Sequence, residues 1–294
     1  MSQLVSISDG TVTAVIDSKG AGLTSLVKGG GEYLWQGDAR YWKGQAPILF
    51  PIVGCLRGNR ASSAAGEVRL GRHGLARNYE HEVVRATASS VTFELASSEA
   101  TRELYPYDFR LNMTYAVEAG TLSQTYEVTN TGTDPLPFTL GGHPAFNVPA
   151  PGGEGEAFSD YALEFDEAWV ARTPAIDTDG LHDFAAQTVV MDGEVRLPLT
   201  HELFEELLTV TFQDVPGRHV RLVGPSGHGV ELSFPGFDYL GVWTAGPEAP
   251  FVAVEPWCGC ATAYDEPDVL EEKRGIITLA PDESCARTFT IRPL

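Results

Sequence analysis

Two residues of this sequence have the side chain and the setting that acid–base chemistry requires. Glu255 follows the apolar run 251–254 in "FVAVEPWCG", and His143 lies in "FTLGGHPAFNVP" between a Gly-Gly pair and a proline. A carboxyl group that ends a strand buried on both faces loses solvent, which raises its pKa and makes it a better base near neutral pH. Packing alone rarely demands two glycines and a proline around a polar ring. The alternatives are a carboxylate paired with an arginine and a histidine that only hydrogen-bonds its turn.

Two further stretches carry cations that could contact a ligand. Residues 72–77, "RHGLAR", hold His73 and Arg77, and Lys43 stands in the apolar segment 41–54. An arginine on a surface often only pairs with a carboxylate, so both readings stay open for this group.

Tryptophans near these stretches could belong to the core or could stack on the apolar face of a sugar. Trp243 precedes the stretch 251–259, and Trp257 follows Glu255 within that stretch. The remaining histidines stand in polar contexts and are predicted to lie on the surface: His81, His182, His201, His219 and His228.

Charge and hydropathy restrict the class of partner. The 294 residues include 40 acidic and 20 basic side chains, a net charge of −20. Nucleic acids and anionic membranes attract basic patches, so neither is expected as a partner. No apolar run reaches the roughly 18 residues of a membrane helix. The start of the chain lacks the basic and apolar regions of a signal peptide, which favours a cytoplasmic protein.

The cysteines indicate neither disulfides nor a metal. Four cysteines in a chain of this length do not form a disulfide framework. Cys258 and Cys260 lack a second pair at the spacing of a zinc site. Reduced thiols, no metal and no cofactor are therefore expected.

Alternation with period two predicts an all-β fold. It is clear in 90–97 and 111–117, in a returning strand over 121–128, in a hairpin over 218–234 and in two strands around 281–284. Many short strands joined by Gly/Pro turns favour a β-sandwich. Segments 201–208 and 265–273 could form short helices, and 149–157 is a surface loop rather than a linker. One domain over 1–294 is predicted.

Four motifs, in this order, resemble the aldose 1-epimerase (galactose mutarotase-like) family, most closely its bacterial LacX-like branch. They stand at 47–54 ("PILFPIVG"), 73–77 ("HGLAR"), 141–147 ("GGHPAFN") and 254–257 ("VEPW"). The resemblance implies a large antiparallel β-sandwich, the galactose mutarotase-like supersandwich, with a sugar-binding cleft.

The resemblance also implies roles for particular residues. Glu255 matches the family's general base and His143 its general acid, while His73 and Arg77 match residues that line the sugar site. Lys43 stands where the phosphosugar branch has a substrate-binding arginine. Interconverting α and β anomers requires a base on the C1 hydroxyl and an acid on the ring oxygen, for which this pair suffices without a cofactor.

Departures from the family pattern leave the substrate open. Cys55 stands where LacX-like proteins usually have arginine, with Arg57 or Arg60 as possible substitutes, and no motif selects the aspartate that holds sugar hydroxyls in the galactose branch. The sequence predicts an isomerase acting on a neutral aldohexose. A hexose-6-phosphate 1-epimerase and a sugar-binding protein with little turnover are the alternatives, and the oligomeric state is undetermined.

Overall fold

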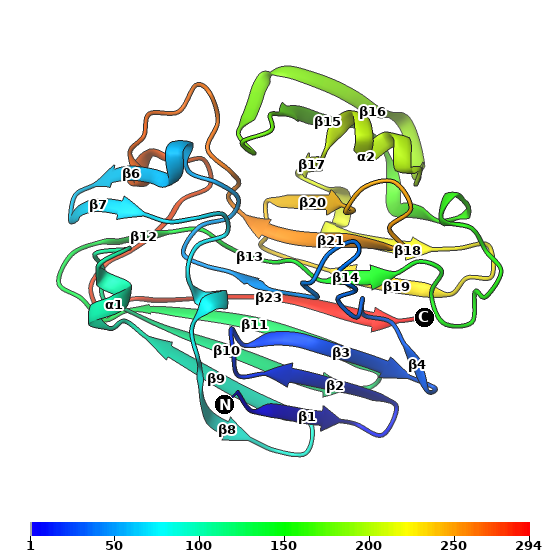
Figure 1. The fold of residues 1–294 in the computed structure, drawn as a ribbon, viewed down its shortest axis with the longest axis horizontal. Coiled ribbons are helices and arrows are strands. Elements are labelled where there is room, and N and C mark those ends of the chain that lie inside the picture. Colours follow the sequence, from blue (N-terminus) through cyan, green and yellow to red (C-terminus); the bar gives the residue numbers. More distant parts are fainter. Residues whose placement is uncertain (1) are drawn as a thin grey trace.

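Antiparallel strands with alternating side chains build most of the molecule (Figure 1). The computed structural model describes residues 2–294. The widest sheet has nine strands in the order β16-β15-β18-β19-β23-β11-β10-β9-β8. Their bounds are β8 Glu82–Ala86, β9 Ser90–Ala96, β10 Phe109–Glu118, β11 Thr121–Asn130, β15 Ala162–Ile176, β16 His182–Pro198, β18 His219–Val223, β19 Gly229–Ser233 and β23 Ser284–Pro293.

A six-stranded sheet carries the residues of greatest chemical interest. Its order is β17-β20-β21-β13-β5, and β14 also pairs with β21. The bounds are β5 Ile48–Leu49, β13 Leu140–Gly142, β14 Ala145–Asn147, β17 Val210–Gln213, β20 Tyr239–Trp243 and β21 Phe251–Cys258. One face of this sheet packs on the nine-stranded sheet, because Val252 and Val254 join the main core together with Met113 and Phe289.

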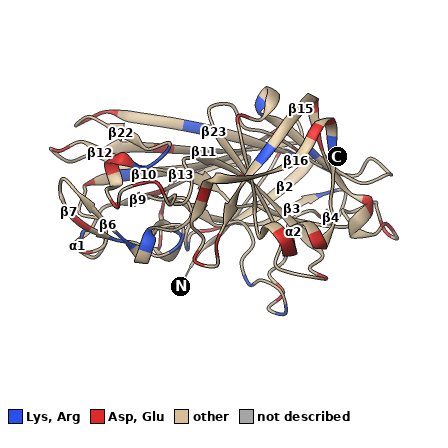
Figure 2. Cartoon of the chain, turned by 90° about the horizontal axis from the view of Figure 1, so that it is seen from above, with Lys and Arg blue, Asp and Glu red and all other residues tan. Residues whose placement is uncertain are grey.

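Smaller elements complete the structure. A four-stranded sheet holds β1 Leu4–Ser8, β2 Val12–Asp17, β3 Gly22–Lys28 and β4 Gly31–Glu32. Two-stranded ladders join β6 Arg60–Ser63 to β7 Gly66–Arg69 and β12 Leu136–Phe138 to β22 Ile277–Leu279. The two α-helices are short, α1 Glu99–Arg102 and α2 His201–Leu207, and Figure 2 shows the acidic segments of α2. No helix within residues 2–294 combines the length and apolarity needed to span a bilayer.

The predicted all-β fold is confirmed, and so are the strands expected from alternation. In β10, for example, every second residue from Phe109 to Val117 is buried. The helix predicted over 201–208 is present as α2. The helix predicted over 265–273 is wrong for most of its length, since only Leu270–Glu272 forms a 3-10 turn.

The longest strands were not anticipated from the sequence. β15 and β16 form a hairpin interrupted by several register shifts, so their side chains do not keep a continuous alternation. Figure 1 shows this hairpin above β20 and β21. The turn end of the hairpin, with Gly180 and His182, reaches the pocket described next.

Candidate functional site

A pocket opens on the face of the six-stranded sheet that is turned away from the main core. Its residues come from β20, β21 and the segment after it, the β13–β14 connection, the β15–β16 hairpin and the loops before β5, β6, β8 and β17. They are Trp42, Gly54, Arg72, His73, Arg77, His143, Ile176, Gly180, His182, Thr209, Trp243, Glu255, Trp257 and Ala261. Four of the five residues in the sequence-based site hypothesis therefore share one pocket.

Alternation along β21 places Glu255 in this pocket. The even-numbered residues Val252 and Val254 face the main core, so Glu255 and Trp257 project from the opposite face. Glu255 pairs with Gly241 of β20 in the middle of the strand, which continues to Cys258. The carboxyl group was expected at a strand end, but it is surrounded by sheet on both sides.

Glu255 and His143 are in direct contact at the pocket floor. His143 Nε2 lies 3.2 Å from Glu255 Oε1, and Trp257 Nε1 donates to Glu255 Oε2 at 3.3 Å. Burial raises the pKa of Glu255 well above its usual value. Burial also lowers the pKa of His143 to about 3. Both shifts favour the uncharged forms, a neutral carboxyl group on Glu255 and a neutral imidazole on His143.

Aromatic side chains fix the imidazole of His143. The indole of Trp42 stacks on it with ring centres 4.9 Å apart, and Trp243 meets it edge-on at 5.5 Å. His73 also lies edge-on, at 5.6 Å. The ring plane is therefore set from three sides, which holds Nε2 toward Glu255.

The glycines before His143 serve packing. A Cβ on Gly141 would lie 2.7 Å from Trp257 Cδ1, and a Cβ on Gly142 would lie 2.7 Å from the Phe289 ring. The expectation that packing would not demand this pair is thus wrong. Gly141 admits the Trp257 indole beside Glu255, and Gly142 faces the core.

His73 has a defined tautomer. Its Nδ1 accepts from the backbone N–H of Gly54 at 3.1 Å, so in the neutral ring the proton is on Nε2. Burial lowers its pKa well below the usual value. His73 also has φ +66°, a left-handed conformation that turns the chain at "RHG". It presents a neutral donor to the pocket.

The aldose 1-epimerase family model matches residues 3–292. The chain belongs to this family. Protein LacX (chromosomal) of Lactococcus lactis subsp. lactis is a 34% identical relative over 291 residues, covering 95% of this chain and 96% of the relative.

Solved structures of related proteins have the same fold. A galactose mutarotase related enzyme from Lactobacillus acidophilus superposes with a TM-score of 0.92 at 27% identity, covering 99% of this chain and 97% of that one. A galactose mutarotase-like protein from Lactobacillus casei ATCC 334 gives 0.90 at 30% identity, covering 99% of both chains. Membership of the epimerase family thus supports a general sugar epimerase function.

Two arginines of this epimerase family member stand together at the pocket. Arg77 is half-buried and its Nη2 donates to the backbone O of Arg72 at 2.8 Å. Among residues 2–294, neither guanidinium forms an ion pair with a carboxylate, although eleven of the sixteen arginines do. Glu255 is the only acidic residue that lines the pocket.

Lys43 lies outside the pocket. It is exposed and lines a neighbouring hollow, which shares Arg77 with the pocket. The two candidates for replacing the arginine expected at position 55 are also elsewhere: Arg57 pairs with Asp268 and Arg60 with Glu67. Cys55 itself is buried, with its Sγ 3.2 Å from where a Cβ on Gly180 would lie.

Two histidines predicted at the surface are buried, which corrects the sequence analysis. His81 is 2% exposed and its Nε2 contacts the backbone O of Ala76. His182 is 1% exposed, lines the pocket and contacts Thr211 Oγ1 at 3.2 Å. Their polar sequence neighbours gave no signal of burial, because distant segments pair at these places: Lys19 bridges to Glu80 beside His81, and Ala263 bridges to His182. His201, His219 and His228 are half-buried.

No group of three or more metal-ligating side chains occurs in the described part of the chain, residues 2–294. The four cysteines are free.

Proposed function

We propose that this protein is an aldose 1-epimerase that interconverts the α and β anomers of an aldohexose, with Glu255 as general base and His143 as general acid. The contact of 3.2 Å between these two side chains in a pocket rimmed by tryptophans carries the proposal. The reaction needs one acid and one base within reach of adjacent oxygens, and this pair meets that requirement.

The pair's single proton matches the proton balance of the reaction. Before a sugar binds, burial favours the proton on Glu255 over His143, because a neutral carboxyl and a neutral imidazole avoid the cost of buried charge. Moving that proton across the contact to His143 Nε2 creates the ionised base and the charged acid. A sugar that hydrogen-bonds both groups replaces the missing solvent and favours this transfer.

Ring opening then proceeds without a net change in protons. Glu255 takes the proton of the C1 hydroxyl, His143 gives its proton to the ring oxygen, and the bond from C1 to that oxygen breaks as the C1 carbonyl forms. After rotation about C1–C2, His143 takes the C5 hydroxyl proton as that oxygen attacks the other face of C1. The ring bond forms again, the C1 carbonyl bond opens, and Glu255 returns a proton to its oxygen. Each positioned proton transfer contributes about 10²–10⁴-fold.

The other pocket groups suit a sugar. Trp42, Trp243 and Trp257 offer apolar faces to its C–H surface. The neutral Nε2–H of His73 and the guanidinium of Arg77 offer donors to its hydroxyl oxygens. Lys43 lines the neighbouring hollow rather than the pocket, so we expect it to act only on a longer or charged substrate.

The arginine pair favours a hexose-6-phosphate as a second candidate substrate. The positive charges of Arg72 and Arg77 repel each other, neither has a carboxylate partner among residues 2–294, and a phosphate would compensate both charges. In a chain of net charge −20, such a local positive site reverses the long-range repulsion of an anion.

Polarimetry of freshly dissolved α-glucose, α-galactose and α-glucose-6-phosphate tests both candidates. We expect anomerisation above the spontaneous rate. A higher kcat/KM for the 6-phosphate that falls with added salt and in Lys43→Ala would select the phosphosugar. A neutral-sugar enzyme would prefer glucose or galactose, with little effect of salt. Tryptophan fluorescence changes without any acceleration would identify a sugar-binding protein and refute the epimerase proposal.

A further inference from the structure

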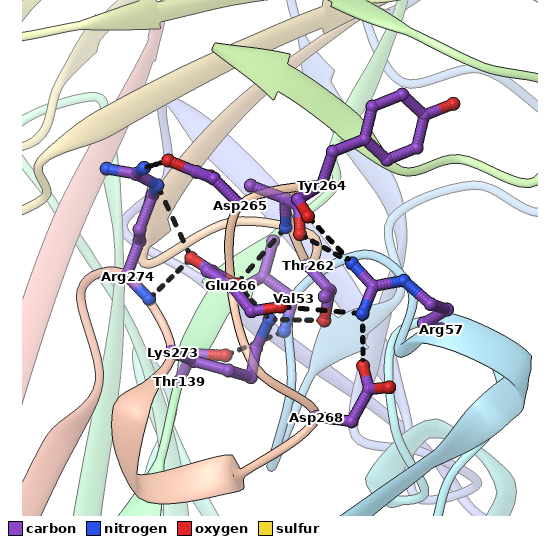
Figure 3. Close-up of polar contacts among 11 residues, drawn as sticks. Val53, Arg57, Thr139, Thr262, Tyr264, Asp265, Glu266, Asp268, Lys273 and Arg274 are labelled. Atoms are coloured by element: carbon purple, nitrogen blue, oxygen red, sulfur yellow. Dashed lines mark hydrogen bonds and ion pairs between the residues drawn. The ribbon is translucent and has the colours of Figure 1, made fainter. Parts of the chain in front are cut away.

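A buried ion pair lies in the segment that follows β21, within the network of polar contacts drawn in Figure 3. The side chains of Lys273 and Glu266 are 2% and 5% exposed, and their charged atoms are 3.8 Å apart. Lys273 Nζ also donates to Thr262 Oγ1 at 2.9 Å. Neither Lys273 nor Glu266 lines the pocket.

Glu266 is saturated with donors. Its Oε2 accepts from the backbone N–H of Ala263 at 3.1 Å, and its Oε1 accepts from the backbone N–H of Arg274 at 2.9 Å. The Arg274 guanidinium approaches the same Oε1 and pairs with Asp265. The carboxylate therefore clamps residues 263–266 to residues 273–274.

Thr262 connects this clamp to two other parts of the chain. Its N–H donates to the backbone O of Cys55 at 2.9 Å, and its backbone O accepts from the N–H of His182 at 3.1 Å. Tyr264 N–H donates in turn to the backbone O of His182 at 2.9 Å. Lys273, through the Thr262 side chain, thus holds the residue at which three segments meet.

Those three segments form one wall of the pocket. The residues that line this wall are Gly54, Gly180, His182 and Ala261. Each lies within two residues of Cys55, Thr262 or His182, which the backbone hydrogen bonds of Thr262 and Tyr264 join. The same wall sets His73, because Gly54 N–H donates to its Nδ1. Glu255 and His143 come from β21 and the β13–β14 connection instead.

We infer that Lys273 and Glu266 are positioning residues, which hold the wall of Gly54, Gly180, His182 and Ala261 against the sugar. A buried ion pair is seldom the most stable filling of its space, since apolar residues often do as well. Its value here is directional, because its charged atoms bond to fixed positions in residues 262–263 and 273–274 and so join those two stretches. The kinetic part of this inference rests on the proposed function.

Hydrogen exchange of the Lys273→Met variant tests the inference independently of activity. Losing the bond to Thr262 should speed exchange of the Thr262, Tyr264 and His182 amides at least about tenfold relative to wild type. Thr262→Val removes only the accepting hydroxyl and should also speed exchange of these amides. It replaces Lys273→Met in the test if that variant does not fold. Tyr115→Phe is the matched control, since it removes one buried hydrogen bond, to Ala21 O at 2.6 Å, elsewhere in the fold. Unchanged exchange at these amides in both test variants would overturn the inference.

Steady-state kinetics distinguishes positioning from general stability. Lys273→Met and Thr262→Val should raise KM about tenfold with kcat within about threefold of wild type, because Glu255 and His143 keep their own supports. Tyr115→Phe should lower thermal stability without changing KM. Equal KM values in wild type and both test variants would refute the role. If wild type neither turns over nor binds sugars, the proposed function fails, and the exchange experiment still decides the positioning of the wall.

Discussion

Two buried glutamates of this protein have opposite surroundings. Glu255 has one neutral donor, the Trp257 indole, and a histidine at 3.2 Å. Glu266 accepts from two backbone N–H groups and lies beside a lysine and an arginine. Both are less than a tenth exposed.

The difference shows what makes a buried carboxyl group reactive. Donors and cations replace the water that Glu266 has lost, so it can hold a structure together as an anion. Burial removes Glu255 from water and few donors replace that water. Its pKa is therefore raised, and the group is ready to exchange a proton. Residue type and burial are shared, and the number of donors separates the two roles.

The largest expected effect is on catalysis at Glu255. Glu255→Gln keeps the shape and removes the base, so kcat should fall at least about 10²-fold with little change in unfolding free energy. Glu266→Gln should lower the stability and leave kcat nearly unchanged, because the new amide N–H faces backbone donors. It should cost about 1–3 kcal/mol in stability with kcat within about threefold. Polarimetry and urea unfolding of both variants check the contrast, and comparable kcat losses would contradict it.

His143 should depend on the same proton as Glu255. His143→Asn should lose activity strongly, and the double variant with Glu255→Gln should lose much less than the product of the two single losses. His219→Asn, outside the pocket, is the control. Multiplicative losses in the polarimetric rates would mean that His143 only shapes its loop.

The pH dependence of stability should reveal His182, one of the two buried histidines that were predicted at the surface. Burial lowers the pKa of His182 to about 4 from an ordinary 6.5. The unfolded chain then binds a proton below pH 6.5 that the folded chain refuses, so this contribution to stability is present above 6.5 and is lost as pH falls toward 4. Between pH 7.5 and 4.5, His182→Gln should remove roughly 2–3 kcal/mol of the decrease seen for wild type in urea unfolding. An unchanged slope would contradict the buried neutral state.

The smallest expected effect is that of metal removal. Because proton transfer between Glu255, His143 and sugar completes the proposed reaction, dialysis against EDTA should leave the polarimetric rate unchanged. Loss of activity with EDTA and its recovery with a divalent ion would refute a mechanism based on this pair alone.

Local patterns in the sequence determined much of this protein. Alternation in β10 and β11 follows directly from the two faces of a strand, and the all-apolar run before Glu255 marks a strand covered on both sides. The four motifs at 47–54, 73–77, 141–147 and 254–257 also carried the resemblance to the family to which the chain belongs.

Only the tertiary structure decided which of these residues meet. Glu255 contacts His143 because β14 pairs with β21 across more than 100 residues of sequence, and no local pattern encodes that register. The need for Gly141 and Gly142 arises from Trp257 and Phe289, which approach from distant strands. His182 is buried, and within the described residues 2–294 Arg72 and Arg77 have no carboxylate partner. Both facts have the same reason, since burial and pairing depend on the side chains that other segments supply. Side-chain identity is local, whereas desolvation and the supply of partners are set by the whole fold.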